Sequence, residues 1–177
     1  MPLAVPDSAP PLVRRMAAAA ESAGVGPFAA VAGAVAEYVA TGLAGYSAEV
    51  VVENGGDDYL VLARERLVAI HAGGSPLSGK VGLRIPAEAT PLAIATSSGT
   101  VGPSVSLGSA DAVTVLARDG ALADAAARAV GNRVHGPADV AGALDVAQGI
   151  EGVLGAVVII GGTLGAWGAA VDLVALG

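Results

Sequence analysis

The fold of this protein depends on residues 50–57, which read Val50-Val51-Val52-Glu53-Asn54-Gly55-Gly56-Asp57. Three consecutive valines predict a short buried strand, because β-branched side chains pack well on a pleated surface. The Asn-Gly-Gly-Asp segment that follows is typical of a tight turn. Its two glycines also leave bare peptide groups that a ligand or a metal could contact. On local pattern alone, an ordinary hairpin turn is favoured over a ligand site.

The segments on both sides of this stretch predict one α+β domain over residues 12–177, preceded by an extended, proline-rich lead-in over residues 1–11. Residues 59–63 and 67–71 are expected to pair as a hairpin around Arg64-Glu65. Helices are expected at 11–23, 28–41, 122–130 and 138–147. Strands are expected at 49–53, 59–63, 67–71, 81–85, 92–95, 112–117, 153–160 and 166–174.

Composition limits both the core and the partners. The 177 residues are 54% hydrophobic but only 3% aromatic, with 26 glycines, so the core must be built from small aliphatic residues on closely packed backbones. A net charge of -7 argues against nucleic acid, which needs clustered lysine and arginine. Because cysteine is absent from the sequence, a disulfide, a thiolate nucleophile and a cysteine metal site are excluded.

Residues 152–171 carry no charge and match the length of a membrane-spanning helix. Gly161 and Gly162 interrupt this run, and β-branched residues crowd residues 157–160. Two buried strands joined at Gly161-Gly162-Thr163 explain the pattern better than a span. The first residues also lack the basic and apolar regions of a signal peptide, so a cytoplasmic protein without a membrane span is expected.

A second candidate site is the Ser/Gly/Thr-rich segment 96–108, which is too long for a simple connector. Its hydroxyls and free amides, beginning with Thr96, Ser97 and Ser98, are good hosts for an anion, although a solvated polar loop explains them equally well. A serine hydrolase would need tertiary contact with one of two histidines, and no G-x-S-x-G elbow is present.

Three other features have ordinary explanations. Gly74-Ser75-Pro76-Leu77-Ser78-Gly79-Lys80 fits G-x-x-x-x-G-K, but Val81 follows and a strand is predicted where a phosphate-binding loop needs a helix. His71 and His135 show no metal-ligand spacing and are interpreted as structural or surface residues. Asp124 lies near the start of a helix, where the helix dipole stabilises a carboxylate without any functional role.

Taken together, five blocks in order resemble a short bacterial and archaeal branch of the ApbE-like superfamily, over roughly residues 26–167. The blocks are Gly26-Pro27 with Ala30-Val31-Ala32-Gly33-Ala34-Val35-Ala36-Glu37, then Val52-Glu53-Asn54-Gly55-Gly56-Asp57, then Ala95-Thr96-Ser97-Ser98-Gly99-Thr100-Val101-Gly102, then Ala110-Asp111-Ala112-Val113, and finally Ala123-Asp124-Ala125 with Gly131-Asn132.

The well-known members of this superfamily are magnesium-dependent flavin transferases that move FMN from FAD onto a protein threonine. The resemblance therefore implies an α+β fold with a mixed sheet and intertwined halves, FAD or FMN as cofactor, and Mg²⁺ held by Asp124. It places the ligand between the Gly-Gly-Asp turn and the Ala-Asp helix. The residues expected to face the ligand are Asn54, Gly55, Gly56, Asp57, Thr96, Ser97, Ser98 and Gly99.

Two departures from the family pattern bear on the chemistry. Arg128 stands where the transferases carry a threonine four residues after the metal-binding aspartate. A guanidinium cannot ligate magnesium, but it binds phosphate directly, so Arg128 joins the expected ligand-binding residues. Pro103 stands where this branch tends to carry histidine, which removes an acid/base group.

The sequence therefore leaves three functions open. The first is the binding of a phosphate-bearing small molecule such as a flavin nucleotide, with or without transferase activity. The second is a non-catalytic accessory or assembly role in small-molecule metabolism. The third is a different transfer reaction on a nucleotide-like substrate, with Arg128 as the anion clamp. The apolar composition also predicts a homo-oligomer of unspecified size.

Overall fold

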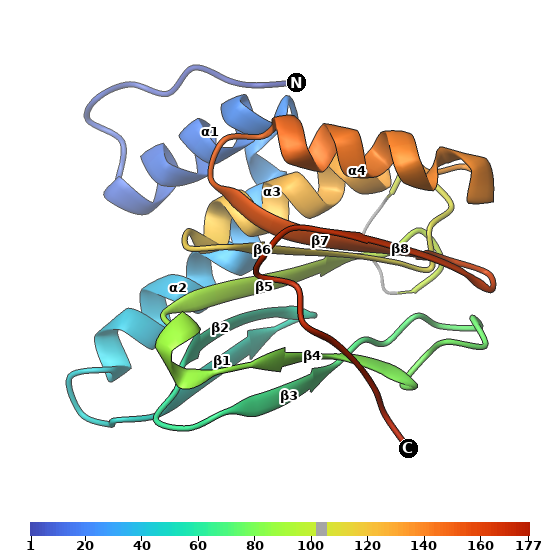
Figure 1. Ribbon diagram of the computed structural model, residues 1–177. Coiled ribbons are helices and arrows are strands. Elements are labelled where there is room, and N and C mark those ends of the chain that lie inside the picture. Colours follow the sequence, from blue (N-terminus) through green and yellow to red (C-terminus); the bar gives the residue numbers. More distant parts are fainter. Residues whose placement is uncertain (102–105) are drawn as a thin grey trace.

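The computed structural model describes residues 1–101 and 106–177, and these form three layers (Figure 1). Helices cover one face of a six-stranded sheet, and a three-stranded sheet covers the other face. The predicted α+β domain is confirmed. The four helices are α1 (Pro11–Ala23), α2 (Val31–Leu43), α3 (Gly120–Gly131) and α4 (Val140–Gly149).

Both sheets are antiparallel throughout, in place of the one mixed sheet that was expected. The large sheet has the order β1 (Val50–Asn54), β2 (Asp57–Val61), β5 (Leu92–Ser97), β6 (Ala112–Ala117), β7 (Val153–Ile160), β8 (Thr163–Trp167). The small sheet has the order β3 (Arg66–Ala69), β4 (Val81–Ile85), β9 (Leu173–Ala175). Even the link from β6 to β7, which carries α3 and α4, returns the chain antiparallel.

The turn after the three valines is confirmed as the tip of the β1–β2 hairpin. Asn54 pairs with Asp57, and Gly55 and Gly56 between them have φ of 67° and 101°. Two consecutive positive φ angles suit the right-handed twist of a two-residue hairpin, and glycine adopts them without steric cost.

The hairpin predicted around Arg64-Glu65 is wrong. β3 pairs with β4 in the small sheet and has no pairing with β2. Val68 and Ile70 alternate with exposed residues and point into the apolar layer between the two sheets. An ion pair from Arg66 to Glu49 ties the start of β3 to the residue before β1.

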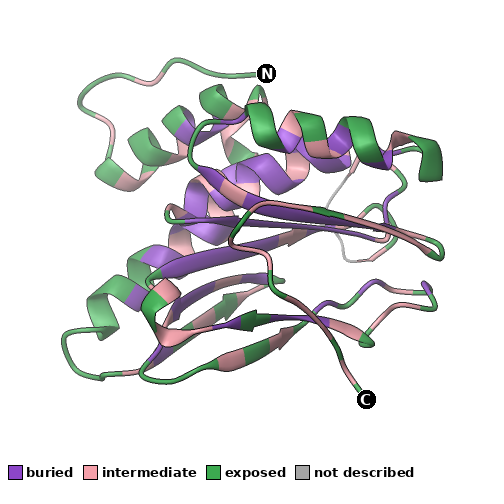
Figure 2. Cartoon of the chain, viewed as in Figure 1, coloured by how far each residue is buried: buried purple, intermediate pink, exposed green. Residues whose placement is uncertain are grey.

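Buried residues lie on the strands of the large sheet and on the helices that cover it (Figure 2), and the two apolar layers differ in composition. Alanine and valine dominate between the helices and the large sheet, whereas leucine and isoleucine dominate between the two sheets. The small residues allow close helix packing: a Cβ on Gly33 of α2 would lie 2.0 Å from the carbonyl oxygen of Gly120 at the start of α3. The predicted core of small residues on close backbones is confirmed for this layer.

The uncharged stretch near the C-terminus forms β7 and β8, joined at Gly161 and Gly162, as predicted. The last predicted strand is too long, because β8 ends at Trp167 and β9 then crosses to the small sheet. Among the described residues, no single helix is long and apolar enough to cross a membrane. The segments Pro11–Ala23 and Pro27–Leu43 meet the length and composition test only as a pair bent by 105°.

Candidate functional site

A cavity of about 600 Å³ opens where the β1–β2 turn, the end of β5 and helices α2 and α3 meet. Most of the residues singled out from the sequence line it. These are Asn54, Gly55, Gly56, Asp57, Thr96, Ser97, Ser98, Asp124 and Arg128. Gly99 is the exception. A Cβ there would lie 2.2 Å from the carbonyl oxygen of Gly108, so Gly99 serves packing between two loop segments.

Two buried carboxyl groups meet in this cavity, within hydrogen-bonding reach of each other. Asp57 Oδ1 accepts a hydrogen bond from the Thr96 amide at 3.1 Å, and Asp124 Oδ2 accepts one from the Gly33 amide at 3.1 Å. Burial, followed by the charge of Asp124, raises the pKa of Asp57 to about 8, and burial also raises the pKa of Asp124. The pair therefore retains a proton near neutral pH.

The position of Asp124 follows from the way α3 begins. Asp119 is the N-cap of this helix and accepts from the Leu122 amide at 2.9 Å, so Asp124 is not the capping residue. Glu37 of α2 accepts from the Gly120 amide at 2.7 Å, and Arg15 of α1 bridges Glu37 and Asp119. These contacts hold α2 across the start of α3, and they place the Gly33 amide against Asp124.

We expect Glu37→Ala to lower the free energy of unfolding by about 2 kcal/mol, because it leaves the buried Gly120 amide without an acceptor. Urea denaturation measures the change. The matched control is Glu65→Ala, which removes an exposed partner 3.9 Å from Arg84 and is expected to cost less than about 1 kcal/mol. Equal effects of the two substitutions would contradict the role assigned to Glu37.

The hydroxyl groups of the cavity have different environments. Thr96 Oγ1 lies 3.0 Å from Thr114 Oγ1 on the adjacent strand. Ser98 Oγ accepts from the amides of Thr100 and Val101 and so shapes a local turn. The hydroxyl of Ser97 is buried and has no hydrogen-bond partner among the described residues, which makes it the hydroxyl that remains available to a ligand.

Arg128 lies one helical turn after Asp124, and both side chains line the cavity, as the spacing predicts. The charge of Arg128 opposes the effect of burial on Asp124 and favours its ionised form. One helix face thus carries an acid and a base side by side. Pro103, the other departure from the family pattern, lies outside the described residues.

Sequence analysis missed several lining residues, namely Phe28, Asp58, His71 and Thr114. Asp58 follows Asp57 on a strand, so its side chain points to the opposite face of the sheet, and burial and the nearby Glu53 raise its pKa to about 6. This alternation was readable from the sequence. The part played by His71 was not: it was interpreted as structural or surface, but it reaches the cavity just beyond the end of β3.

Among the described residues, no group of three or more histidine, aspartate or glutamate side chains could hold a metal ion. The oxygens of Asp57 and Asp124 nevertheless suit magnesium, which commonly takes one or two carboxylates and completes its shell with water and substrate phosphates. The donor set therefore fits a magnesium ion that a ligand helps to hold.

Comparison with known proteins shows the family of this chain. The model of the family described as AbpE bacteria matches residues 1–164, which include every residue that lines the cavity. The chain belongs to this family. The match supports the predicted ApbE-like relationship.

Members of the UPF0280 group are similar to this AbpE bacteria chain over most of its length. The UPF0280 protein of Methanocella arvoryzae is 47% identical over 168 residues, which are 94% of this chain and 68% of that protein. The protein of Methanosphaerula palustris is 46% identical over 170 residues, or 96% and 70%. UPF0280 protein MJ1526 of Methanocaldococcus jannaschii is 41% identical over 178 residues, or 98% and 72%. The chain thus spans about two thirds of the length of these archaeal relatives.

Proposed function

We propose that this protein binds a phosphate-bearing nucleotide, with FAD or FMN as the first candidates, together with Mg²⁺ in the cavity between the β1–β2 turn and α3. The observation that carries the proposal is the meeting of Asp57 and Asp124 with Arg128 in one cavity. The two carboxyl groups suit a cation, and the guanidinium suits an anion. Magnesium bound to a phosphate chain presents both charges to one site.

The acidic pair supports the magnesium part of the proposal. Burial first, and then the charge of Asp124, raises the pKa of Asp57 to about 8 when no cation is bound. A divalent cation would replace the retained proton and bind both groups. Magnesium would also neutralise charge on the phosphates. In the transferases a threonine is a metal ligand at the position of Arg128, and a guanidinium cannot take that place. The phosphate oxygens and water would therefore complete the magnesium shell.

Arg128 and Ser97 support the phosphate part. A guanidinium presents paired N–H donors that match two phosphate oxygens, and Ser97 adds a buried hydroxyl with no other described partner. The peptide groups of Gly55 and Gly56 carry no side chain that would keep a ligand away. The volume of about 600 Å³ lies within the range of about 300–1,000 Å³ for small-molecule sites.

Calorimetric titration with FAD, FMN and ADP, each with and without Mg²⁺, tests this function. We expect at least one nucleotide to bind, and we expect Mg²⁺ to strengthen that binding. Asp124→Ala should abolish the magnesium effect. If none of the three nucleotides binds with or without Mg²⁺, the proposal is wrong.

Arg128→Ala is expected to weaken nucleotide binding about 10- to 100-fold, because a charge-assisted, bidentate contact to phosphate is lost. Arg128→Lys should recover only part of this affinity, since lysine keeps the charge without the planar pair of donors. Arg84→Ala is the control, as Arg84 is an exposed residue of β4 outside the cavity. An affinity unchanged by Arg128→Ala would exclude the phosphate clamp.

A second candidate is a non-catalytic accessory role, which the replacement of the transferase threonine by Arg128 favours. In this role the protein binds the nucleotide without transferring FMN. Incubation with FAD, Mg²⁺ and a threonine-containing acceptor peptide separates the two candidates. Covalent flavin on the peptide supports the transferase, whereas stable binding without transfer supports the accessory role.

A further inference from the structure

The large sheet has two edge strands, β1 and β8, and β1 is the one that borders helix α2. Among the described residues, β1 pairs only with β2. An unpaired edge presents free N–H and C=O groups that can pair with another strand, and natural proteins usually protect such edges with charge, proline or a covering segment. Here the edge strand is Val-Val-Val-Glu-Asn, and its second residue, Val51, is 53% exposed.

The hydrogen bonds of the hairpin identify the free groups. The Gly56 carbonyl accepts from the Thr96 amide of β5, so the backbone groups of Asp57 point the other way, to β1. Asn54 lies opposite Asp57 in this antiparallel pair, so the backbone N–H and C=O of Asn54 point inward, towards β2. The direction alternates along the strand, which leaves the N–H and C=O of Val51 and Glu53 facing outward.

Helix α2 borders this edge with an uncharged surface. Ala36 and Ala40 pack on the large sheet, and Gly33 packs on α3. At 3.6 residues per turn, Val39 and Leu43 then fall on the flank away from α3, above the outermost strand. The same flank meets the end of β1, where the Asn54 amide donates to the Ala32 carbonyl at 3.1 Å.

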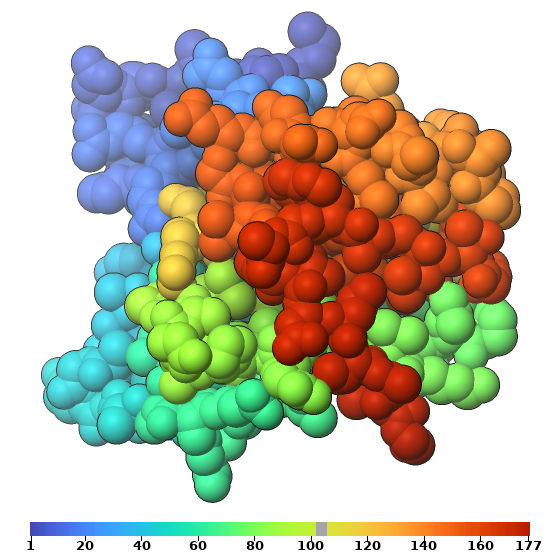
Figure 3. All heavy atoms as spheres, in the orientation of Figure 1, coloured from blue at the N-terminus to red at the C-terminus, as the bar shows by residue number. Residues whose placement is uncertain are grey.

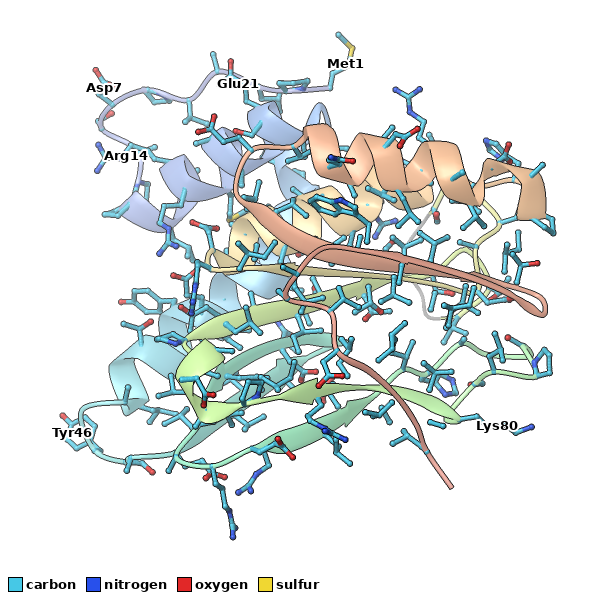
Figure 4. All side chains as sticks on the ribbon, viewed as in Figure 1. Met1, Asp7, Arg14, Glu21, Tyr46 and Lys80 are labelled. Atoms are coloured by element: carbon cyan, nitrogen blue, oxygen red, sulfur yellow. The ribbon has the colours of Figure 1, made fainter. Side chains whose placement is uncertain are left out.

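The only charged residue of α2 is Glu37, which is buried and paired with Arg15. Aromatic side chains are rare in this protein, and yet Tyr46, just after α2, is 91% exposed. Tyr46 projects away from the body just after α2 (Figure 4). Figure 3 shows the end of α2 and the residues after it, in cyan, at one flank of the molecule, where the C-terminal strands do not cover them.

We propose that this edge face, formed by β1 with Val39, Leu43 and Tyr46, binds a second copy of the chain, so that two β1 strands pair across a twofold axis and two α2 helices pack beside them. A twofold axis pairs a strand with its own copy in the antiparallel direction, so β1 complements itself. The net charge of -7 disfavours contact between copies elsewhere, whereas the α2 part of this face carries no exposed charge.

The charges on β1 disfavour two registers, and full overlap of β1 (Val50–Asn54) with its copy favours the register centred on Val52. With Val51 on the axis, Glu53 would lie opposite Glu49 of the other copy, and with Glu53 on the axis the two Glu53 side chains would meet. Like charges directly opposite each other destabilise a sheet. With Val52 on the axis, Glu53 lies opposite Val51, and the outward backbone groups of these two residues pair. The two Gly55-Gly56 turns then lie at opposite ends of the paired β1 strands, so each cavity keeps its own opening.

The available area matches this partner. Each large aromatic side chain buries about 150–250 Å² in an interface. Tyr46 supplies up to about 250 Å², and Val39, Leu43, Val51 and the paired β1 backbones add to it, towards the ~800 Å² per partner of a standard specific interface.

Sedimentation of the full chain over the micromolar range tests the proposal first. We expect a dimer. Leu43→Glu should shift it to monomer by burying like charges, and Val51→Pro should do the same by removing an outward N–H, a change that an edge strand tolerates. Leu67→Glu is the control, because Leu67 is 56% exposed on β3 and outside the edge face. Circular dichroism confirms that each variant is folded.

Cysteine cross-linking tests the register, since the sequence has no cysteine of its own. With Val52 on the axis, Val52→Cys should give a disulfide-linked dimer under mild oxidation, whereas Leu67→Cys should stay monomeric on a denaturing gel. A monomeric wild-type protein would overturn the proposal, even if another segment or protein protects the edge face in hydrogen exchange. A dimer that survives both Leu43→Glu and Val51→Pro would overturn it as well. Neither outcome depends on what the cavity binds.

Discussion

Asp57→Asn is expected to stabilise the protein at pH 8 and to flatten the dependence of its stability on pH. In the folded protein the pKa of Asp57 rises from 3.8 to about 8, first through burial and then through the charge of Asp124. Between these two values the folded state holds a proton that the unfolded state has released. Stability therefore falls as the pH rises from about 4 to 8, because the unfolded state binds fewer protons.

The expected size of this effect is on the order of 3 kcal/mol at pH 8. Each pKa unit corresponds to about 1.4 kcal/mol, and relaxation and water entry reduce the full value for a buried pair. Asparagine carries no charge and can donate its amide to Asp124. Urea denaturation of wild type and variant at pH 5 and pH 8 measures the difference, with exposed Asp145→Asn as the control.

Magnesium links this prediction to the proposed function. If Asp57 and Asp124 bind the cation, Mg²⁺ should restore the stability of the wild type at pH 8, since a ligand that binds only the folded state stabilises it. The same addition should have little effect on Asp57→Asn. A wild type that is more stable at pH 8 than at pH 5 without Mg²⁺ would contradict the repulsion between the two carboxyl groups.

Much of the cavity could be predicted because its parts are local. The valines and the Asn54-Gly55-Gly56-Asp57 turn are encoded within one short segment, and the spacing from Asp124 to Arg128 is one helical turn. These features need no knowledge of distant neighbours. The same applies to β7 and β8, where two glycines interrupt an apolar run.

The other features of the fold and the cavity depend on strand and helix pairings, which the periodicity of apolar residues does not specify. Alternation shows that Val68 and Ile70 share a face, but it does not show that β3 leaves β2 for a second sheet with β4. Thr114 lies opposite Thr96 only because of the register of β5 and β6. The crossing of α2 and α3 could not be predicted either, because it brings together Gly33 and Asp124, which are ninety-one positions apart in the sequence.

Gly33→Ala is expected to cost about 4 kcal/mol or to prevent folding, because that crossing has no room for a side chain. A Cβ at Gly33 would lie 2.0 Å from the Gly120 carbonyl oxygen and 2.9 Å from the Asp124 Cβ. Backbone atoms on both sides cannot move without separating the helices, and overpacking of this kind costs more than the roughly 1 kcal/mol that alanine gains as a better helix former.

Gly42→Ala on the same helix is the matched control, since nothing lies within 4 Å of a Cβ there, and it should stabilise the protein by up to about 1 kcal/mol. A Cβ at Gly120 would meet the Gly33 carbonyl at 2.3 Å, so combining the two glycine substitutions should cost less than the sum of the two. If Gly33→Ala folds, the separated helices should withdraw the Gly33 amide from Asp124 and weaken nucleotide binding. Wild-type stability in this variant would show that the helices do not cross at Gly33, and the placement of Asp124 beside Asp57 would lose its structural basis.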